Sequence, residues 1–159
     1  MNREASSMIT DFFVYGTLKR GECRVSMWPR KPLRIREAFI HARLYDLGPY
    51  PAIRVDEVDG DEAMGGDWDW VSGEVWFFDR IDVPATLVAL DEIEVTNQRG
   101  YRNLYDQVLV RAYDRPGSRT SQLALAYQYN SQSRLIHSRC LRPGEGKTFV
   151  FWSAGPEEP

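Results

Sequence analysis

Strand-forming patterns far outnumber helix-forming ones in this chain, and this limits the folds that it can adopt. Residues 82–95 (DVPATLVALDEIEV) are the one segment with clear helical spacing: Pro84 stands where a helix can begin, and Leu87, Leu90, Ile93 and Glu94 share a face. Most other apolar runs are short and rich in aromatic and β-branched residues, as in strands. Regular alternation of strand and helix is missing, which excludes a doubly wound sheet. The sequence predicts an α+β fold with a mixed, curved sheet.

Six strands are predicted. They cover 11–16 (in DFFVYGTL, ending at Gly16), 37–46, 52–55, 71–78, 105–113 and 122–130. The last two flank the turn sequence RPGSRT and should pair as an antiparallel hairpin. The acidic stretch 56–70 fits no calcium-loop spacing and is interpreted as an exposed loop. The last thirty residues are expected to be irregular, with FVFW at 149–152 as their apolar cluster, which could cover part of a pocket.

Length and composition narrow the class of protein. At 159 residues, with 43% apolar residues, the chain is expected to form one globular domain over 1–159. No apolar run approaches the ~20 residues of a membrane span, and the N-terminus lacks a signal-peptide pattern, so a cytoplasmic location without membrane association is expected. The 20 basic and 23 acidic residues are well mixed, which argues against nucleic-acid binding. The basic residues of segment 19–31 are interpreted as a solvated surface, in preference to an acid-binding patch: Lys19, Arg20, Arg24, Arg30 and Lys31.

Residues that commonly bind metals or carry redox chemistry are sparse. Cys23 and Cys140 lie far apart and are expected to be free thiols. His41 and His137 are single, so no metal site is predicted, and His41 should be a packed or surface residue of its strand. Phosphate-binding and hydrolase glycine motifs are missing, so neither a cofactor nor nucleotide chemistry is predicted.

Two features could carry chemistry. The glycine turn Tyr15-Gly16-Thr17-Leu18 follows a strand, and its backbone N–H groups could bind a carboxylate or an oxyanion; the alternative is that Gly16 only turns the chain. Glu94 lies on the apolar side of the predicted helix, where desolvation would raise its pKa toward neutrality. Asp91 and Glu92 are interpreted as the solvated surface of the same helix.

Five segments in order add to this reading. They are VYGTLKRGE at 14–22, LYDLGPYPAI at 44–53, VSGEVW at 71–76, LDEIE at 90–94 and LYDQVLV at 104–110. Over about residues 12–130 the chain resembles the γ-glutamylcyclotransferase-like (AIG2-like) family. The resemblance implies that fold, and an enzyme that releases 5-oxoproline from a γ-glutamyl amine or amino acid without metal or cofactor.

The same resemblance implies roles for individual residues. Glu94 matches the family's catalytic glutamate, and the turn of Tyr15, Gly16, Thr17 and Leu18 matches the loop that holds the glutamyl end of the substrate. A further substrate-binding Tyr is matched by Tyr105, with Tyr101 as the other possible alignment.

The sequence departs from the family pattern at two positions. Val95 stands in place of a usual Gly, and Gln107 stands in place of an Arg in the alignment that takes Tyr105 as the family's Tyr. These departures leave a second hypothesis, a γ-glutamyl-binding or regulatory module without turnover, and a weaker third one, a different amide-cleaving reaction. The carboxylate at position 94 favours catalysis, because a site for an acidic ligand gains nothing from another negative charge. The oligomeric state and the group attached to the γ-glutamyl moiety are left open.

Overall fold

The computed structural model describes residues 9–55 and 68–154, and the described part of the chain is dominated by strands. Most of the acidic stretch interpreted as a loop, residues 56–67, lies outside the described residues. In chain order the elements are β1 (Asp11–Val14), η1 (Val25–Met27), β2 (Arg34–Asp46), β3 (Pro51–Arg54), β4 (Asp69–Phe77), η3 (Arg80–Asp82), α2 (Val83–Glu94), β5 (Tyr105–Tyr113), β6 (Ser121–Tyr129), α3 (Gln132–Leu135) and β7 (Arg139–Leu141).

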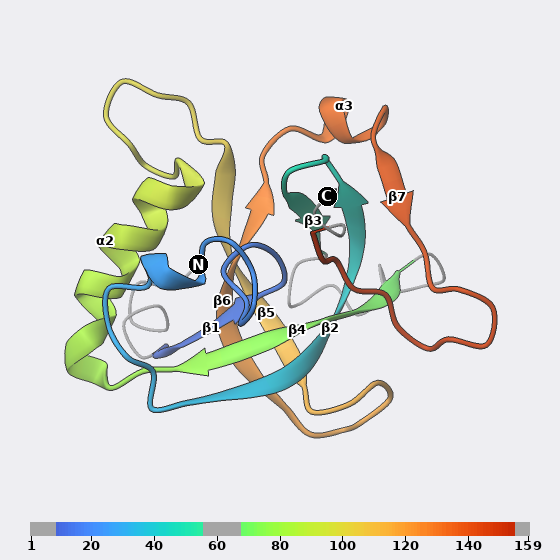
Figure 1. Ribbon diagram of the computed structural model, residues 1–159, viewed down its shortest axis with the longest axis horizontal. Helices are drawn as coiled ribbons and strands as arrows, with labels where there is room; N and C mark the ends of the chain where they lie inside the picture. Colours follow the sequence, from blue (N-terminus) through green and yellow to red (C-terminus); the bar gives the residue numbers. More distant parts are fainter. Residues whose placement is uncertain (1–8, 56–67, 155–159) are drawn as a thin grey trace, which may run out of the picture.

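Five strands close into a barrel, which confirms the predicted mixed, curved sheet. The strands follow the order β2-β4-β1-β6-β5, and a pairing of β5 with β2 at Phe39 and Tyr113 closes the ring. β1 runs antiparallel to β4 and parallel to β6, so the N-terminal strand lies in the middle of the sheet. β3 and β7 both pair with the far end of β2, at Leu44, and extend the sheet beyond the barrel. Figure 1 shows α2 along one side of this sheet, and β3 and β7 on the other.

The predicted hairpin is confirmed, and β2 is longer than predicted. β5 and β6 pair in continuous register, from Tyr105 opposite Tyr129 to Tyr113 opposite Ser121. β2 begins at Arg34, three residues before the predicted start, because Arg34 pairs with Phe77 of β4 and its guanidinium lies 4.1 Å from the centre of that ring. A cation over an aromatic face is stabilising, so a basic residue can begin this strand.

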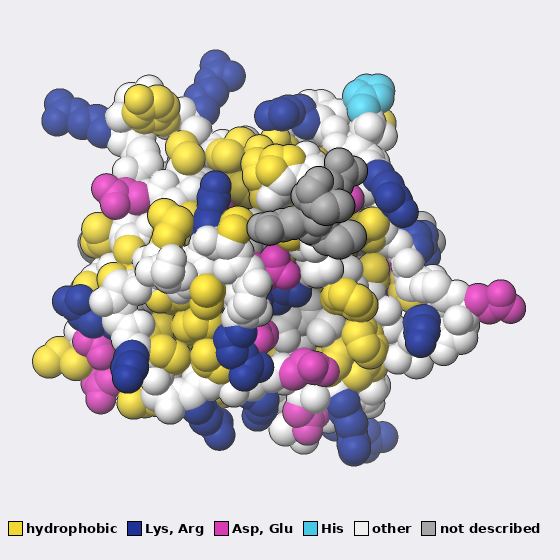
Figure 2. Space-filling model, in the orientation of Figure 1, with side chains coloured by type: hydrophobic (Ala, Val, Ile, Leu, Met, Phe, Trp, Pro, Cys, Tyr) yellow, Lys and Arg dark blue, Asp and Glu magenta, His cyan; other side chains and the backbone are white. Residues whose placement is uncertain are grey.

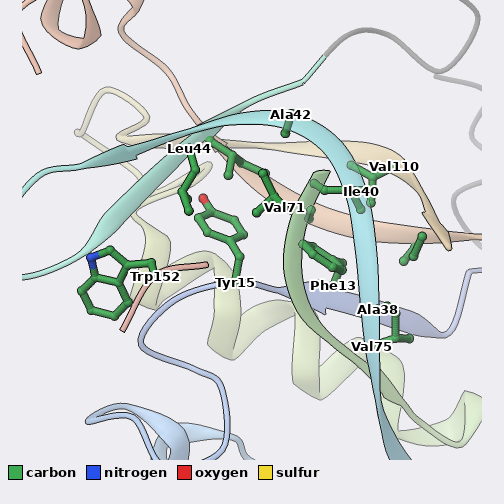
Figure 3. Packing of buried hydrophobic residues seen from close by; sticks show 14 of the residues in the cluster. Phe13, Tyr15, Ala38, Ile40, Ala42, Leu44, Val71, Val75, Val110 and Trp152 are labelled. Carbon is green, nitrogen blue, oxygen red and sulfur yellow. The ribbon is translucent and has the colours of Figure 1, made fainter. Parts of the chain in front are cut away.

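Successive side chains of β1 enter different parts of the core, as the alternation of a strand requires. Phe13 belongs to the cluster inside the barrel, where small residues such as Ala38 and Ala126 leave room for aromatic rings. Phe12 belongs to the cluster beneath α2, together with the fully buried Leu90. Figure 3 shows the interior cluster, with the Tyr15 ring directed toward Leu44 and Trp152 beside it.

Val150 and Trp152 of the segment 149–152 belong to the barrel core, whereas Phe151 is 58% exposed. Val150 forms an isolated parallel bridge to Val71, its N–H donates to the Trp70 carbonyl at 2.9 Å, and Trp152 is 3% exposed. Lys19 Nζ donates to the Trp152 carbonyl at 2.6 Å, which joins this segment to the loop after β1. The stretch predicted to be irregular also contains α3 and β7, whose short lengths give little pattern in the sequence.

The visible surface carries charges of both signs. On the face shown in Figure 2, Lys and Arg side chains are dispersed among Asp, Glu and apolar groups. Within residues 9–55 and 68–154, no helix combines the length and the hydropathy needed to cross a bilayer.

Candidate active site

A cavity of about 150 Å³ lies where the end of β1, the end of α2 and the starts of β3 and β5 meet. It is smaller than the roughly 300–1,000 Å³ typical of pockets for drug-sized ligands, and it suits a ligand near the size of one amino acid. The described residues that line it are Phe13, Val14, Tyr15, Gly16, Thr17, Leu18, Arg24, Tyr50, Pro51, Ile93, Glu94, Val95, Leu104, Tyr105 and Tyr127. The structure therefore brings together every site residue predicted from the sequence: Tyr15, Gly16, Thr17, Leu18, Glu94 and Tyr105.

The turn after β1 supplies backbone donors to the wall of the cavity. Within the described part of the chain, no acceptor is found for the N–H groups of Gly16, Thr17 and Leu18. The loop is held by other bonds: Lys19 N–H donates to the Gly16 carbonyl at 3.1 Å, and Arg24 N–H donates to the Thr17 carbonyl at 2.8 Å. Consecutive free N–H groups of this kind can bind an anionic oxygen.

Glycine is required at position 16 for close packing and not for a left-handed backbone. A Cβ atom on Gly16 would lie 2.6 Å from Cγ of Pro51, closer than such atoms can approach, and its φ angle is not positive. Pro51 lines the same cavity, so Gly16 lets β3 approach the turn. The interpretation that Gly16 simply turns the chain is therefore incomplete.

Glu94 lies at the last position of α2 and is partly buried against the cavity. One face of α2 packs against the core, as the helical spacing predicted. Leu90 is fully buried there, and Leu87 and Ile93 are partly buried against the same cluster. Burial raises the pKa of Glu94 to about 7, and the nearby positive charge of Arg24 opposes that rise. At neutral pH the carboxyl group can therefore both accept and donate a proton.

Val95 explains why glycine suits the position after the helix. Its φ of 52° and ψ of 56° place it in the left-handed region, where a β-branched residue is strained. The surrounding bonds hold it there: Thr96 N–H donates to the Asp91 carbonyl at 2.8 Å, and Leu104 N–H donates to the Val95 carbonyl at 2.9 Å. The departure from the family pattern thus keeps the backbone turn and adds a side chain to the cavity wall.

The hydroxyl of Tyr105 forms a hydrogen bond within the protein. It donates to the Pro51 carbonyl at 2.7 Å, and the side chain is 4% exposed, so the ring forms the wall of the cavity. Burial is the main cause that raises the pKa of Tyr105 far above its ordinary value. Tyr101, the alternative alignment, is 74% exposed and is not among the lining residues, so Tyr105 is the one of the two tyrosines that lies at the cavity.

Asp91 was wrongly interpreted as a solvated helix residue. Its Oδ1 accepts hydrogen bonds from Tyr127 Oη and from Gln107 Nε2, both at 2.7 Å, and these bonds tie α2 to β6 and β5. Tyr127 also accepts, at its carbonyl, a 2.6 Å hydrogen bond from the Tyr15 hydroxyl. Gln107, where the family has Arg, is therefore part of the support behind the cavity. The i, i+3 spacing of Asp91 and Glu94 was the available signal, because it places both on one side of the helix.

The interpretation of the basic segment 19–31 as a solvated surface is right for Arg20, Arg30 and Lys31, which are exposed, and wrong for Lys19 and Arg24, which are partly buried. Arg24 lines the cavity, Lys19 binds the Trp152 carbonyl, and Arg20 Nε pairs with Glu74 Oε2 at 2.8 Å. Arg30 Nε lies 3.4 Å from an Asp82 carboxylate oxygen. Arg24, Lys19 and Arg20 connect the loop after β1 to the cavity, the C-terminal segment and β4.

Other candidate residues lie outside the cavity lining. His41 is packed against Trp70 at a ring-centre distance of 3.6 Å, as its strand position predicted, and burial lowers its pKa. Cys23 and Cys140 are free thiols, as expected. Among the described residues, no group of three or more His, Cys, Asp or Glu side chains could hold a metal ion. The segment 149–152 contributes no residue to the described lining, so the expectation that it covers the pocket finds no support.

The barrel thus carries a helix-terminal glutamate beside a glycine turn. The sequence matches the family described as "Gamma-glutamyl cyclotransferase, AIG2-like" over residues 12–145, and the chain belongs to this family. The match extends about fifteen residues beyond the resemblance seen in the motifs, through α3 and β7.

Solved structures share the fold. The AIG2-like protein from Mus musculus is 18% identical, with a TM-score of 0.54, and the alignment covers 84% of this chain and 86% of that one. YkqA from Bacillus subtilis is 23% identical, with a TM-score of 0.50 and 77% of this chain covered, but this chain spans only 36% of YkqA. At these identities the likeness concerns the fold alone. No curated protein matches the sequence.

Proposed function

We propose that this chain is a γ-glutamylcyclotransferase-type enzyme that releases 5-oxoproline from a γ-glutamyl amine or amino acid. The observation that supports this most is the pairing of a carboxyl group of pKa about 7, at Glu94, with free backbone donors at 16–18 in one small cavity. Acyl transfer needs both parts: a group that moves protons near neutral pH, and donors for a developing oxyanion.

In the proposed reaction the substrate attacks itself. The ionised Glu94 carboxylate takes a proton from the α-ammonium group, and the resulting amine attacks the γ-carbonyl carbon to close a five-membered ring. The carbonyl oxygen becomes an oxyanion, which the N–H groups of 16–18 stabilise. The bond to the leaving nitrogen then breaks. Attacker and target share one molecule, so the cavity mainly has to hold the ring-closing geometry.

The proton balance gives Glu94 its role in both halves of the reaction. Between the α-ammonium group and the lactam, the attacking nitrogen loses two protons. Between the amide and the released ammonium group, the leaving nitrogen gains two. A carboxyl group of pKa about 7 can accept from the first nitrogen and donate to the second.

The test is 5-oxoproline release from a panel of γ-glutamyl amino acids and γ-glutamyl amines. Glu94→Gln keeps the size and polarity of the side chain but cannot carry the proton, so turnover should fall by about 10²–10⁴-fold. Glu92→Gln is the matched control, because Glu92 is an exposed acid on the same helix and does not line the cavity. Asp91 is unsuitable as a control, since it supports Tyr127 and Gln107.

Each outcome distinguishes among the hypotheses. A Glu94→Gln variant as fast as the wild type would remove Glu94 from the mechanism. A wild-type protein that is inert on the whole panel but binds 5-oxoproline would favour the γ-glutamyl-binding module. A wild-type protein that releases the amine without forming 5-oxoproline would favour the different amide-cleaving reaction.

A further inference from the structure

Arg24 is a charged residue of the cavity for which the proposed reaction gives no role. Among the described lining residues, Arg24 and Glu94 are the two that carry a charge. The backbone of Arg24 is fixed by its N–H bond to the Thr17 carbonyl. Within the described part of the chain, its guanidinium has neither an ion pair nor a hydrogen bond, and its side chain is partly buried. Guanidinium groups present several donors in a plane that matches a carboxylate.

The substrate of the proposed reaction brings a carboxylate to this place. In a γ-glutamyl compound the α-carboxylate and the α-amino group are attached to the same carbon atom. If the amino group lies against Glu94 to lose its proton, the α-carboxylate must lie within a few ångströms of the same acid. Two like charges so close repel each other, and a neighbouring cation offsets that repulsion.

We propose that the Arg24 guanidinium binds the α-carboxylate of the γ-glutamyl group, and so makes that carboxylate a requirement for recognition. This inference rests on the proposed function, because it takes the substrate orientation from it. Arg24 is near enough to Glu94 for its charge to oppose the rise in the pKa of that acid, which agrees with a carboxylate site beside the proton-transferring group.

The test compares two small lactams that differ in one group. 5-Oxoproline carries the carboxylate, and 2-pyrrolidinone is the same ring without it. Binding of each is measured by calorimetry or by inhibition, in the wild type and in Arg24→Gln, Arg24→Lys and Arg20→Gln. Arg20 is the matched control, since its side chain is mostly exposed, pairs with Glu74 and does not line the cavity.

The wild type should prefer 5-oxoproline over 2-pyrrolidinone by about 10- to 100-fold, the range for hydrogen bonds to charged groups. Arg24→Gln should lose that preference while binding 2-pyrrolidinone as the wild type does, and Arg24→Lys should retain part of it. Arg20→Gln should keep the full preference. Thermal unfolding should change little in Arg24→Gln, because the guanidinium makes no hydrogen bond within residues 9–55 and 68–154.

Three results would overturn the proposal: equal binding of the two lactams by the wild type, an unchanged preference in Arg24→Gln, or loss of both lactams by a folded Arg24→Gln. If Arg24→Gln weakens turnover of γ-glutamyl amino acids but spares γ-glutamyl amines, Arg24 recognises the leaving group instead. Failure of the proposed function would give a different result. The protein would then turn over no γ-glutamyl compound of the panel, while its preference for 5-oxoproline would still depend on Arg24.

Discussion

Glu94→Gln should make the folded state less sensitive to rising pH. The pKa of Glu94 rises from 4.5 to about 7 in the folded protein because burial disfavours the charged carboxylate. Below the lower value both states hold the proton, and the folded state is not penalised. Between the two values the unfolded chain has lost the proton while the folded one keeps it, so the stability of the wild type falls as pH rises.

The shift sets the size of the effect. At about 1.4 kcal/mol per pKa unit, ionisation of Glu94 should lower the free energy of unfolding of the wild type by about 3 kcal/mol between about pH 4.5 and about pH 8. Glutamine does not titrate, so the variant escapes the loss, and its stability relative to the wild type should increase by that amount over the same interval.

Urea unfolding at the two pH values measures the difference, with tryptophan fluorescence as the signal. Trp28 and Trp76 are suitable reporters because their rings stack in the folded protein at a centre distance of 4.4 Å. Glu92→Gln removes a carboxylate from an exposed position and provides the baseline. If the free energies of unfolding of Glu94→Gln and the wild type stay parallel across this interval, the carboxyl group is not held at a raised pKa, and the proton-transfer role loses its support.

Three further predictions concern other residues. Val95→Gly should raise the free energy of unfolding by about 0.5–1 kcal/mol, since relief of left-handed strain exceeds the entropy that glycine adds to the unfolded chain; a destabilised variant in the same urea assay would contradict this. Asp91→Ala should lower it by about 1–3 kcal/mol, because two hydrogen-bond donors lose their acceptor, and a change near zero would show that the bonds are dispensable. Reductant should leave the melting temperature unchanged, as Cys23 and Cys140 are free, whereas a fall of several degrees would reveal a disulfide.

Local pattern was sufficient for most elements of the fold. The hairpin of β5 and β6 was predictable because each strand alternates and a turn sequence joins them, and α2 because Pro84 and the apolar spacing mark it. The first residues of β2 and the whole of β7 were missed. Their strand character comes from pairing with distant partners, at Phe77 and Leu44, and not from their own composition.

The site was predictable in part for the same reason. The turn 15–18 and Glu94 could be found because each is a continuous motif, and the structure places both on one cavity. Arg24 and Tyr127 could not, because an arginine in a basic segment and a tyrosine in an alternating strand have ordinary explanations. Only the parallel pairing of β6 with β1 brings Tyr127 to the hydroxyl of Tyr15, 112 residues away.

The burial of Trp152 has a consequence for biosynthesis. The loop that follows the turn at Tyr15 is bound to the C-terminal segment by a hydrogen bond from Lys19 to the Trp152 carbonyl, which are 133 residues apart. On the ribosome, the glycine turn is made early, but Trp152 is translated only after all five barrel strands, the last of which ends at Tyr129. Such long-range contacts close late and slow the search for the native state. A released chain truncated before residue 149 could form the hairpin of β5 and β6, yet it would leave the barrel interior around Tyr15 open to water.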